Sequence, residues 1–194
     1  IAVGIALVIG GMLGATAGYY GGWIDNGIMR VMDVLLSIPQ TLLAIAIIAA
    51  LGANLMNLMI AVGVSEVPTY ARIVRGSVLS IRGMEFIEAA RSVGADNGRI
   101  IMRYIVPNSL APLIVQSTLG VAGAILSIAG LSFLGLGIQP PTPEWGSMLS
   151  NARTYIRDAW HITMIPGAGI MLTILALNLV GDGLRDALDP KLKS

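Results

Sequence analysis

Long stretches without any charged residue dominate the chain. They cover residues 1–24, 34–65, 104–143 and 159–181. A helix needs about 20 apolar residues to cross the hydrocarbon core of a bilayer, so the first and last stretches each hold one membrane span. The second is long enough for two spans, with a turn predicted at Leu51–Asn57. The third holds one span and a re-entrant or loop segment.

This pattern predicts an all-α membrane protein in which residues 1–194 form a single transmembrane domain. Five spans are expected, at roughly 2–21, 31–51, 55–75, 108–131 and 161–182. Two segments are expected outside the bilayer, a hairpin at 84–106 and a loop at 135–160.

The distribution of Lys and Arg predicts which end faces the cytoplasm. If the connections alternate between sides, ten of the twelve basic residues fall on one side, and only Arg153 and Arg157 fall on the other. Because cytoplasmic loops are enriched in Lys and Arg, we expect the 84–106 hairpin and the C-terminus in the cytoplasm. Five spans would then leave Ile1 outside, which predicts that one earlier span precedes this sequence.

Composition supports the membrane class and excludes several functions. The chain is 55% hydrophobic and 12% charged, with a mean hydropathy of +0.80. A net charge of +1 gives no electrostatic basis for binding nucleic acid. The absence of cysteine excludes disulfides, thiolate metal sites and cysteine nucleophiles. The only lysines are Lys191 and Lys193, so no phosphate-binding loop exists and another chain would have to bind any nucleotide.

Glycines and prolines within the spans suggest how the helices pack and bend. The first span contains four glycines spaced four apart, namely Gly10, Gly14, Gly18 and Gly22. Such a stripe favours close helix packing, and a moving helix seam is the functional alternative. Pro39 and Pro68 each remove a backbone donor within or near a span.

Ionisable side chains in the apolar stretches give no catalytic or metal site. Asp33 and Glu66 are expected at the cytoplasmic interface, with Asp33 paired to Arg30 one turn away. His161 beside Trp160 is interpreted as a residue of the membrane interface. No cluster of His, Asp and Glu has metal-ligand spacing and no nucleophile has a base beside it, so this chain is not expected to be an enzyme.

The segment 84–108, MEFIEAARSVGADNGRIIMRYIVPN, predicts two short helices joined at Gly94. Its first helix covers about 84–93, Gly94 suits a left-handed helix end, and Asp96 caps a second helix at about 97–106. The apolar residues are Phe86, Ile87, Ala90, Val93, Ile100, Ile101, Tyr104 and Ile105. This apolar face could pack on the chain itself or in a groove of a partner.

The same segment resembles the EAA loop of the permease subunits of ABC importers. The shared features are Glu88-Ala89-Ala90, Gly94 and Pro107 at fixed spacing, and the departures are Tyr104 and Val106. Other stretches resemble the dipeptide, oligopeptide and nickel branch of that family: 17–25 (AGYYGGWID), 29–33 (MRVMD), 70–75 (YARIVR), 131–141 (LSFLGLGIQPP) and 181–190 (GDGLRDALDP).

This resemblance implies a permease subunit of six spans in the plasma (inner) membrane of a bacterium or archaeon. It implies a second homologous permease, two cytoplasmic ATPase subunits that bind ATP and magnesium, and an extracytoplasmic solute-binding protein as partners. This chain itself would hold no cofactor. The implied ATPase-coupling residues are Glu88, Ala89, Ala90, Gly94 and Pro107.

The loop 135–160 has two interpretations. Its prolines favour an extended first part, and Ser150–Arg157 predicts a short helix near the aromatic residues Trp145, Tyr155 and Trp160. The loop is either a re-entrant interfacial segment or a docking surface for the binding protein, with Arg153 and Arg157 as candidate contacts.

The transported solute is expected to be a di- or oligopeptide, with nickel or another small solute as the alternative. The alternative class of transporter is a secondary carrier that works without an ATPase. A carrier would be expected to have paired charges at the bilayer midplane.

Overall fold

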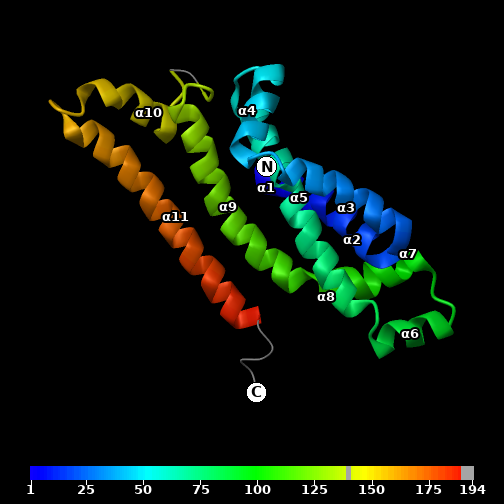
Figure 1. Ribbon diagram of the computed structural model, residues 1–194. Helices are drawn as coiled ribbons and strands as arrows, with labels where there is room; N and C mark the ends of the chain where they lie inside the picture. The colour runs from blue at the N-terminus through cyan, green and yellow to red at the C-terminus, as the bar shows by residue number, and fades with distance from the viewer. Residues whose placement is uncertain (139–140, 189–194) are drawn as a thin grey trace.

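The computed structural model describes residues 1–138 and 141–188, and all its regular elements in these ranges are helical (Figure 1). In chain order they are α1 Ala2–Ile5, η1 Ala6–Gly10, α2 Gly11–Tyr20, α3 Gly22–Leu36, α4 Gln40–Leu51, α5 Leu55–Ile81, α6 Glu85–Ser92, α7 Asn97–Ile100, η2 Ile101–Ile105, α8 Val106–Asn108, α9 Leu110–Phe133, α10 Trp145–Ala152, η3 Arg153–Tyr155 and α11 Trp160–Leu188. The prediction of an all-α membrane protein is confirmed.

Three helical segments in the described ranges are long and apolar enough to cross a membrane. They are Ala2–Tyr20, Leu110–Phe133 and Trp160–Leu188. They match the first, fourth and fifth expected spans. The helix α5 covers the third and continues to Ile81, but it carries three charged residues and is not among these apolar segments.

The second expected span, 31–51, is wrong as a single straight helix. The helices α3 and α4 meet at an angle of 88° around Ser37–Pro39. Pro39 has no amide hydrogen and disfavours helical backbone at Ile38, so the helix breaks there and restarts at Gln40. The count of five spans is therefore not confirmed, because this pair is either one broken span or a re-entrant segment.

The predicted turn between α4 and α5 is present and well defined. Gly52 has a φ of +88°, which favours glycine. The side chain of Asn54 accepts a hydrogen bond from the amide of Asn57 at 2.9 Å and so caps α5. Asn57 in turn donates to the carbonyl of Leu51 at 2.7 Å.

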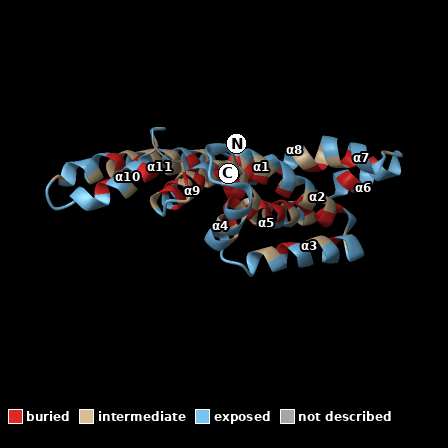
Figure 2. Cartoon of the chain, turned by 90° about the horizontal axis from the view of Figure 1, so that it is seen from above, coloured by how far each residue is buried: buried red, intermediate tan, exposed pale blue. Residues whose placement is uncertain are grey.

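The core of the bundle forms around α5. The helices α1, α2, α3, α4 and α9 all contact it, and buried residues lie along α2 and α5 in Figure 2 while α11 is largely exposed. Tyr70, near the middle of α5, is fully buried and donates to the carbonyl of Gln116 on α9 at 3.3 Å. The exposed apolar surface of α11 suits lipid or another helix.

Glycines bring η1 and α2 against α5. A Cβ added at Gly10 would lie 2.6 Å from the carbonyl oxygen of Val67, and one at Gly14 would lie 2.2 Å from that of Ala71. Gly18 faces Val78 in the same way. These three glycines therefore allow close helix packing, which is the first of the two interpretations given for the stripe. Gly22 lies outside the contact, at the first residue of α3, with φ +53°.

Ion pairs connect α3 to α5. Arg75 makes two hydrogen bonds to the carboxylate of Asp25, at 2.5 and 2.7 Å. Asp33 pairs with Arg72 at 2.9 Å, so the expected local pair with Arg30 is wrong. Asp33 pairs with Arg72 rather than with Arg30 because α3 lies beside α5 and places Arg72 within reach.

Glu66 also lies elsewhere than expected. It is near the middle of α5 rather than at a helix end, and it accepts a hydrogen bond from the side-chain amide of Gln40 at 2.5 Å. The pair joins α5 to the start of α4, directly after the break at Pro39.

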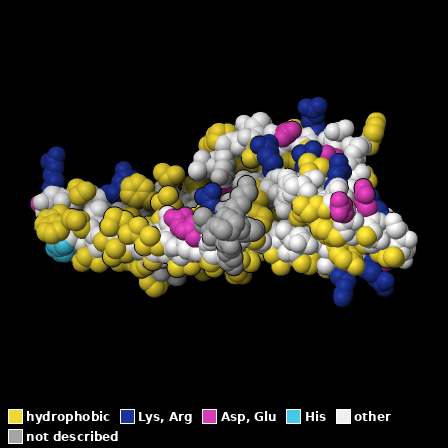
Figure 3. Space-filling view, turned by 90° about the horizontal axis from the view of Figure 1, so that it is seen from below, with side chains coloured by type: hydrophobic (Ala, Val, Ile, Leu, Met, Phe, Trp, Pro, Cys, Tyr) yellow, Lys and Arg dark blue, Asp and Glu magenta, His cyan; other side chains and the backbone are white. Residues whose placement is uncertain are grey.

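The two ends of the molecule carry different elements. In Figure 1 the α6–α8 region and the end of α11 lie at the lower end, whereas α4 and α10 lie at the upper end. Figure 3 looks onto the lower end, where basic and acidic side chains gather among hydrophobic ones on the side of α6 and α7. The hairpin and the end of α11 thus share one face.

Candidate functional site

The first arm of the hairpin is α6, which begins directly after an extended Met84. Glu85 and Glu88 occupy its first turn and Arg91 its last turn. These charges complement the helix dipole, which favours acidic residues at the start and basic residues at the end. The first arm is therefore a short helix, as predicted, and its terminal charges favour it.

Gly94 ends this helix in the left-handed conformation predicted from sequence, with a φ of +82°. The amide of Ala95 bonds to the carbonyl of Ala90 at 3.0 Å, and that of Gly94 bonds to the carbonyl of Arg91 at 2.9 Å. These two bonds form a Schellman motif, which satisfies carbonyls left open at a helix end. The chain therefore turns here with two of the carbonyls at the end of α6 hydrogen-bonded.

The second arm starts at Asp96 and runs into α9. The side chain of Asp96 accepts a hydrogen bond from the amide of Arg99 at 3.2 Å, so the predicted N-cap is confirmed. Helical backbone continues through α7, η2 and α8 despite Pro107. The segment before the proline is a π-helix, and Asn108 donates a side-chain hydrogen bond to the carbonyl of Tyr104 at 2.6 Å. Such local adjustment is how a helix accommodates a proline.

The apolar face of the hairpin packs on its own chain. Ile87, Ala90, Ile100 and Ile105 are buried in the same cluster as residues of α2, α5 and α9. The first of the two alternatives therefore holds for this buried part of the face, whereas Phe86 and Val93 remain exposed. What remains for a partner is the outward surface.

Hydrogen bonds and a cation–π contact also tie the hairpin to the end of the first span. The hydroxyl of Tyr19 donates to Oδ1 of Asn97 at 2.6 Å, and the guanidinium of Arg91 lies 5.6 Å from the centre of the Tyr19 ring. Arg82, just before the hairpin, donates to the carbonyl of Gly18 at 2.9 Å. The hairpin is therefore in contact with α2 as well as with α5 and α9.

The outward surface of α6 presents charge and apolar side chains together. Glu88 and Ala89 are exposed, and Val93 is 86% exposed. Phe86 is partly exposed at 38% and its ring lies 6.4 Å from that of Tyr104 on the second arm. Because a charged side chain is costly in hydrocarbon, this surface is suited to water or to another protein rather than to lipid tails.

The sequence-predicted site residues are only partly brought together. Glu88 and Ala89 face outward on one helix and Gly94 is exposed at its end, but Ala90 is buried at 6% exposure. Pro107 lies apart from them, in a shallow hollow that it lines with Arg99 and Arg103.

The loop 135–160 folds against the spans in the part that the structure describes. Its helix is Trp145–Ala152, capped by Glu144, so the expected helix at 150–157 begins too late. It contacts both α9 and α11. The guanidinium of Arg153 lies 5.1 Å from the centre of the Phe133 ring, while Arg157 is exposed. The expected extended part includes residues 139 and 140, which lie outside the described residues.

Comparison with known proteins decides the family. Residues 10–194 match the family described as binding-protein-dependent transport system inner membrane component. The chain belongs to this family. The resemblance read from the EAA-like segment is confirmed, and this inner membrane component is a multi-pass transport protein rather than an enzyme.

Several relatives of this transport component are named as permeases for peptides. It is 56% identical to the dipeptide transport system permease protein DppC of Alkalihalophilus pseudofirmus, over 97% of this chain and 62% of that protein. It is 49% identical to the di/tripeptide permease DppC of Pseudomonas aeruginosa, over 98% and 63%. It is 51% identical to the glutathione permease GsiD of Escherichia coli, over 99% and 63%. The chain thus spans about three-fifths of the length of these relatives.

Solved structures show the same fold. An inward-facing structure of the methionine ABC transporter MetNI matches with a TM-score of 0.76 at 20% identity, over 97% of this chain and 89% of that chain. An amino acid ABC transporter matches with a TM-score of 0.67 at 15% identity, over 96% and 86%. At these identities the likeness concerns the fold alone.

The residues that hold the hairpin of this inner membrane component in place were not predicted from the sequence. Tyr19, Arg82 and Asn97 belong to different predicted elements, and no periodicity connects them. One signal was available, because Tyr19 and Tyr20 stand at the end of an otherwise apolar span where polar tips reach the interface.

Proposed function

We propose that this chain is the permease subunit of an ATP-driven importer of di- and oligopeptides, and that its hairpin couples it to a cytoplasmic ATPase. One observation carries the coupling proposal. The hairpin presents Glu88, Ala89 and Val93 outward while its inner face is packed against α2, α5 and α9. A protein bound to the outer surface would therefore act on several helices at once.

The proposed assembly contains this chain, a second homologous permease, two ATPase subunits and an extracytoplasmic binding protein, in a bacterial or archaeal inner membrane. ATP and magnesium belong to the ATPase subunits. The cytoplasmic placement of the hairpin and the C-terminus is supported by the excess of Lys and Arg on that side. It is further supported by the shared position of the hairpin and the end of α11 at one end of the molecule.

In the proposed mechanism, closure of the ATPases on ATP displaces the hairpin. This displacement is passed to the spans by the hydrogen bond from Tyr19 to Asn97 and by the buried side chain of Ile87. The spans then switch the side of the membrane on which the translocation pathway is open. Glu88 makes a polar or ionic contact with the ATPase, and Ala89 permits close approach. Ala90 contributes by packing α6 on its own chain, and Gly94 and Pro107 shape the two ends of the hairpin.

The test uses two substitutions at Gly94 in the assembled transporter. Both force a side chain into a positive φ, which costs about 1–2 kcal/mol. A Cβ at this position meets nothing within 4 Å in this chain. Gly94→Ala therefore adds strain with little bulk, whereas Gly94→Trp adds the same strain and a large side chain at an exposed position. We expect Gly94→Ala to retain most ATP-dependent uptake and Gly94→Trp to abolish it while inserting normally in the membrane.

Normal uptake by the Gly94→Trp variant would contradict the coupling role. The substrate is tested in the same membrane vesicles with labelled dipeptides and with radioactive nickel. ATP-dependent uptake of nickel but not of peptides would replace the peptide proposal by the nickel alternative. Uptake without an ATPase would favour the secondary carrier.

A further inference from the structure

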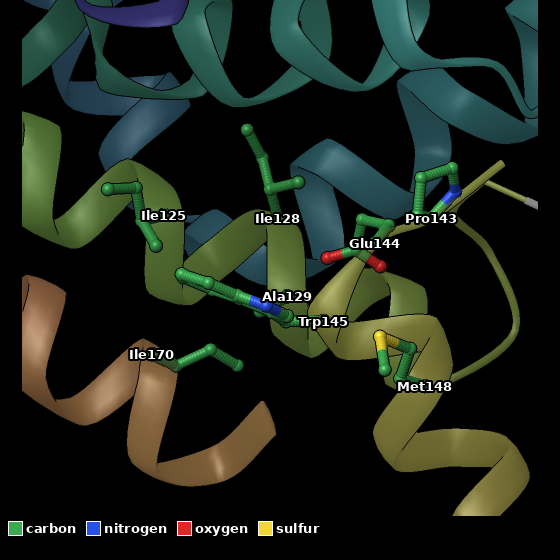
Figure 4. A pocket seen from close by; sticks show the side chains of 8 residues that line it. All are labelled: Ile125, Ile128, Ala129, Pro143, Glu144, Trp145, Met148 and Ile170. Atoms are coloured by element: carbon green, nitrogen blue, oxygen red, sulfur yellow. The ribbon is translucent and has the colours of Figure 1, made fainter. Parts of the chain in front are cut away.

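A pocket of about 380 Å³ lies where α9, α10 and α11 meet, at the end of the molecule opposite the hairpin (Figure 4). Its walls are largely aliphatic and include Ile125 and Ile128 of α9 and Ile170 of α11. Met148, Trp145 and Glu144 complete it. Pockets of a few hundred Å³ with apolar walls and few polar groups are typical of small-ligand sites.

Among the described residues that line this pocket, the charged group is the carboxylate of Glu144. Its oxygens accept hydrogen bonds from the amides of Gly146 and Ser147 at 2.8 and 2.7 Å, which fixes the side chain at the start of α10. A carboxylate has about four acceptor positions, so two bonds leave capacity for a ligand. In Figure 4 this carboxylate and the indole of Trp145 face the same space.

The indole of Trp145 is held by close packing. A Cβ at Gly169 of α11 would lie 3.2 Å from its ring, so the ring rests directly on the α11 backbone. A Cβ at Gly146 would lie 2.2 Å from the carbonyl oxygen of Ala129, so α10 sits equally close to α9. The carboxylate and the aromatic ring therefore occupy fixed positions on packed helices.

We infer that this pocket binds the protonated amino terminus of a small peptide, with the first apolar side chain of that peptide between the isoleucines. The inference rests on the proposed function, which brings peptides to this end of the molecule. A carboxylate and the face of an indole both attract a cation, and neither interacts as well with an acylated, neutral nitrogen. The isoleucine walls favour a residue such as leucine over a polar one.

Equilibrium dialysis tests this inference on the assembled transporter without ATP, in nanodiscs of phosphatidylglycerol, which carries no amine. The probes are radiolabelled leucyl-alanine and its N-acetyl derivative. We expect saturable binding of leucyl-alanine and about tenfold weaker binding by Glu144→Gln, because a charge-assisted hydrogen bond is lost. The glutamine oxygen can accept only one of the two amide hydrogen bonds that cap α10, so the unfolding temperature of the variant is measured beside its binding to separate loss of the charge from loss of the fold.

A second variant tests the apolar wall. Ile125→Phe places a larger side chain in the pocket and reduces its free volume. It should weaken binding of leucyl-alanine and leave the hydrogen bonds of Glu144 at the start of α10 intact. Equal binding of acetylated and free peptide, or unchanged binding by Glu144→Gln, would overturn the inference. Displacement of the peptide by phosphatidylethanolamine at the same site would assign the pocket to a lipid amine.

The same preparation separates this inference from the proposed function. ATP-dependent peptide uptake without binding to this pocket would remove the inference alone. Absence of uptake by the wild type under conditions where the ATPases hydrolyse ATP would remove the proposed function, whatever the pocket binds.

Discussion

Tyr19 donates a hydrogen bond to Asn97 at 2.6 Å across 78 residues of sequence. The bond joins the last turn of α2 to the second arm of the hairpin. Arg91 on the first arm contacts the same tyrosine ring. One side chain of the first span thus contacts both arms of the segment proposed to meet the ATPase.

Removing this bond should loosen the hairpin. Tyr19→Phe keeps the ring beneath Arg91 but removes the donor, which is worth about 0.5–1.5 kcal/mol. We expect amides of α6 and α7 to exchange hydrogen roughly two- to tenfold faster, as measured by mass spectrometry. Tyr20→Phe is the control because Tyr20 is 50% exposed, and equal effects of the two variants would show that the bond does not hold the hairpin.

The two ion pairs between α3 and α5 should differ in their effect on stability. The side chains of Asp25 and Arg75 are 12% and 32% exposed, whereas those of Asp33 and Arg72 are 56% and 58% exposed. Asp25→Asn should cost about 1–3 kcal/mol because a doubly hydrogen-bonded guanidinium loses its charged partner. Asp33→Asn should cost less than about 1 kcal/mol, since exposed pairs are screened by solvent. Thermal unfolding in detergent measures both, and a larger loss for Asp33→Asn would contradict the ranking.

Close packing of α2 on α5 predicts a difference between neighbouring glycines. Gly14→Ala would place a Cβ 2.2 Å from the backbone oxygen of Ala71, whereas a Cβ at Gly11 meets nothing within 4 Å. Because the helices must separate to relieve the clash, Gly14→Ala should lower stability by about 1–3 kcal/mol. Gly11→Ala should be neutral or slightly stabilising, as alanine favours helix. Equal unfolding temperatures for the two variants would argue against this helix contact.

The packing of Trp145 on α11 gives a spectroscopic prediction. Gly169→Ala would bring a Cβ within 3.2 Å of the indole, so the ring should shift toward the pocket. Gly167→Ala is the control, because its Cβ would meet only a leucine methyl at 3.8 Å. In a background with Trp23 and Trp160 replaced by Phe, we expect the emission maximum of Trp145 to move only in Gly169→Ala. An unchanged spectrum would show that the ring does not rest on this glycine.

Local features of this protein follow from its sequence alone. Uncharged stretches located three of the spans because only long apolar helices satisfy their backbone within lipid. Gly94 and Asp96 marked the end of one arm of the hairpin and the start of the other because a left-handed turn and an N-cap have strong residue preferences. The family could also be recognised from the spacing of Glu88, Gly94 and Pro107.

Tertiary structure decided which of these local features meet. The break at Pro39 turned an expected span into two helices at 88°, and the position of α3 beside α5 exchanged the local partner of Asp33 for Arg72. The burial of Ala90 and the bond from Tyr19 to Asn97 depend on helices distant in sequence. The pocket at Glu144 and Trp145 likewise exists only because glycines allow α10 to approach α9 and α11. Periodicity describes one helix at a time, whereas these contacts depend on how separate helices pack together.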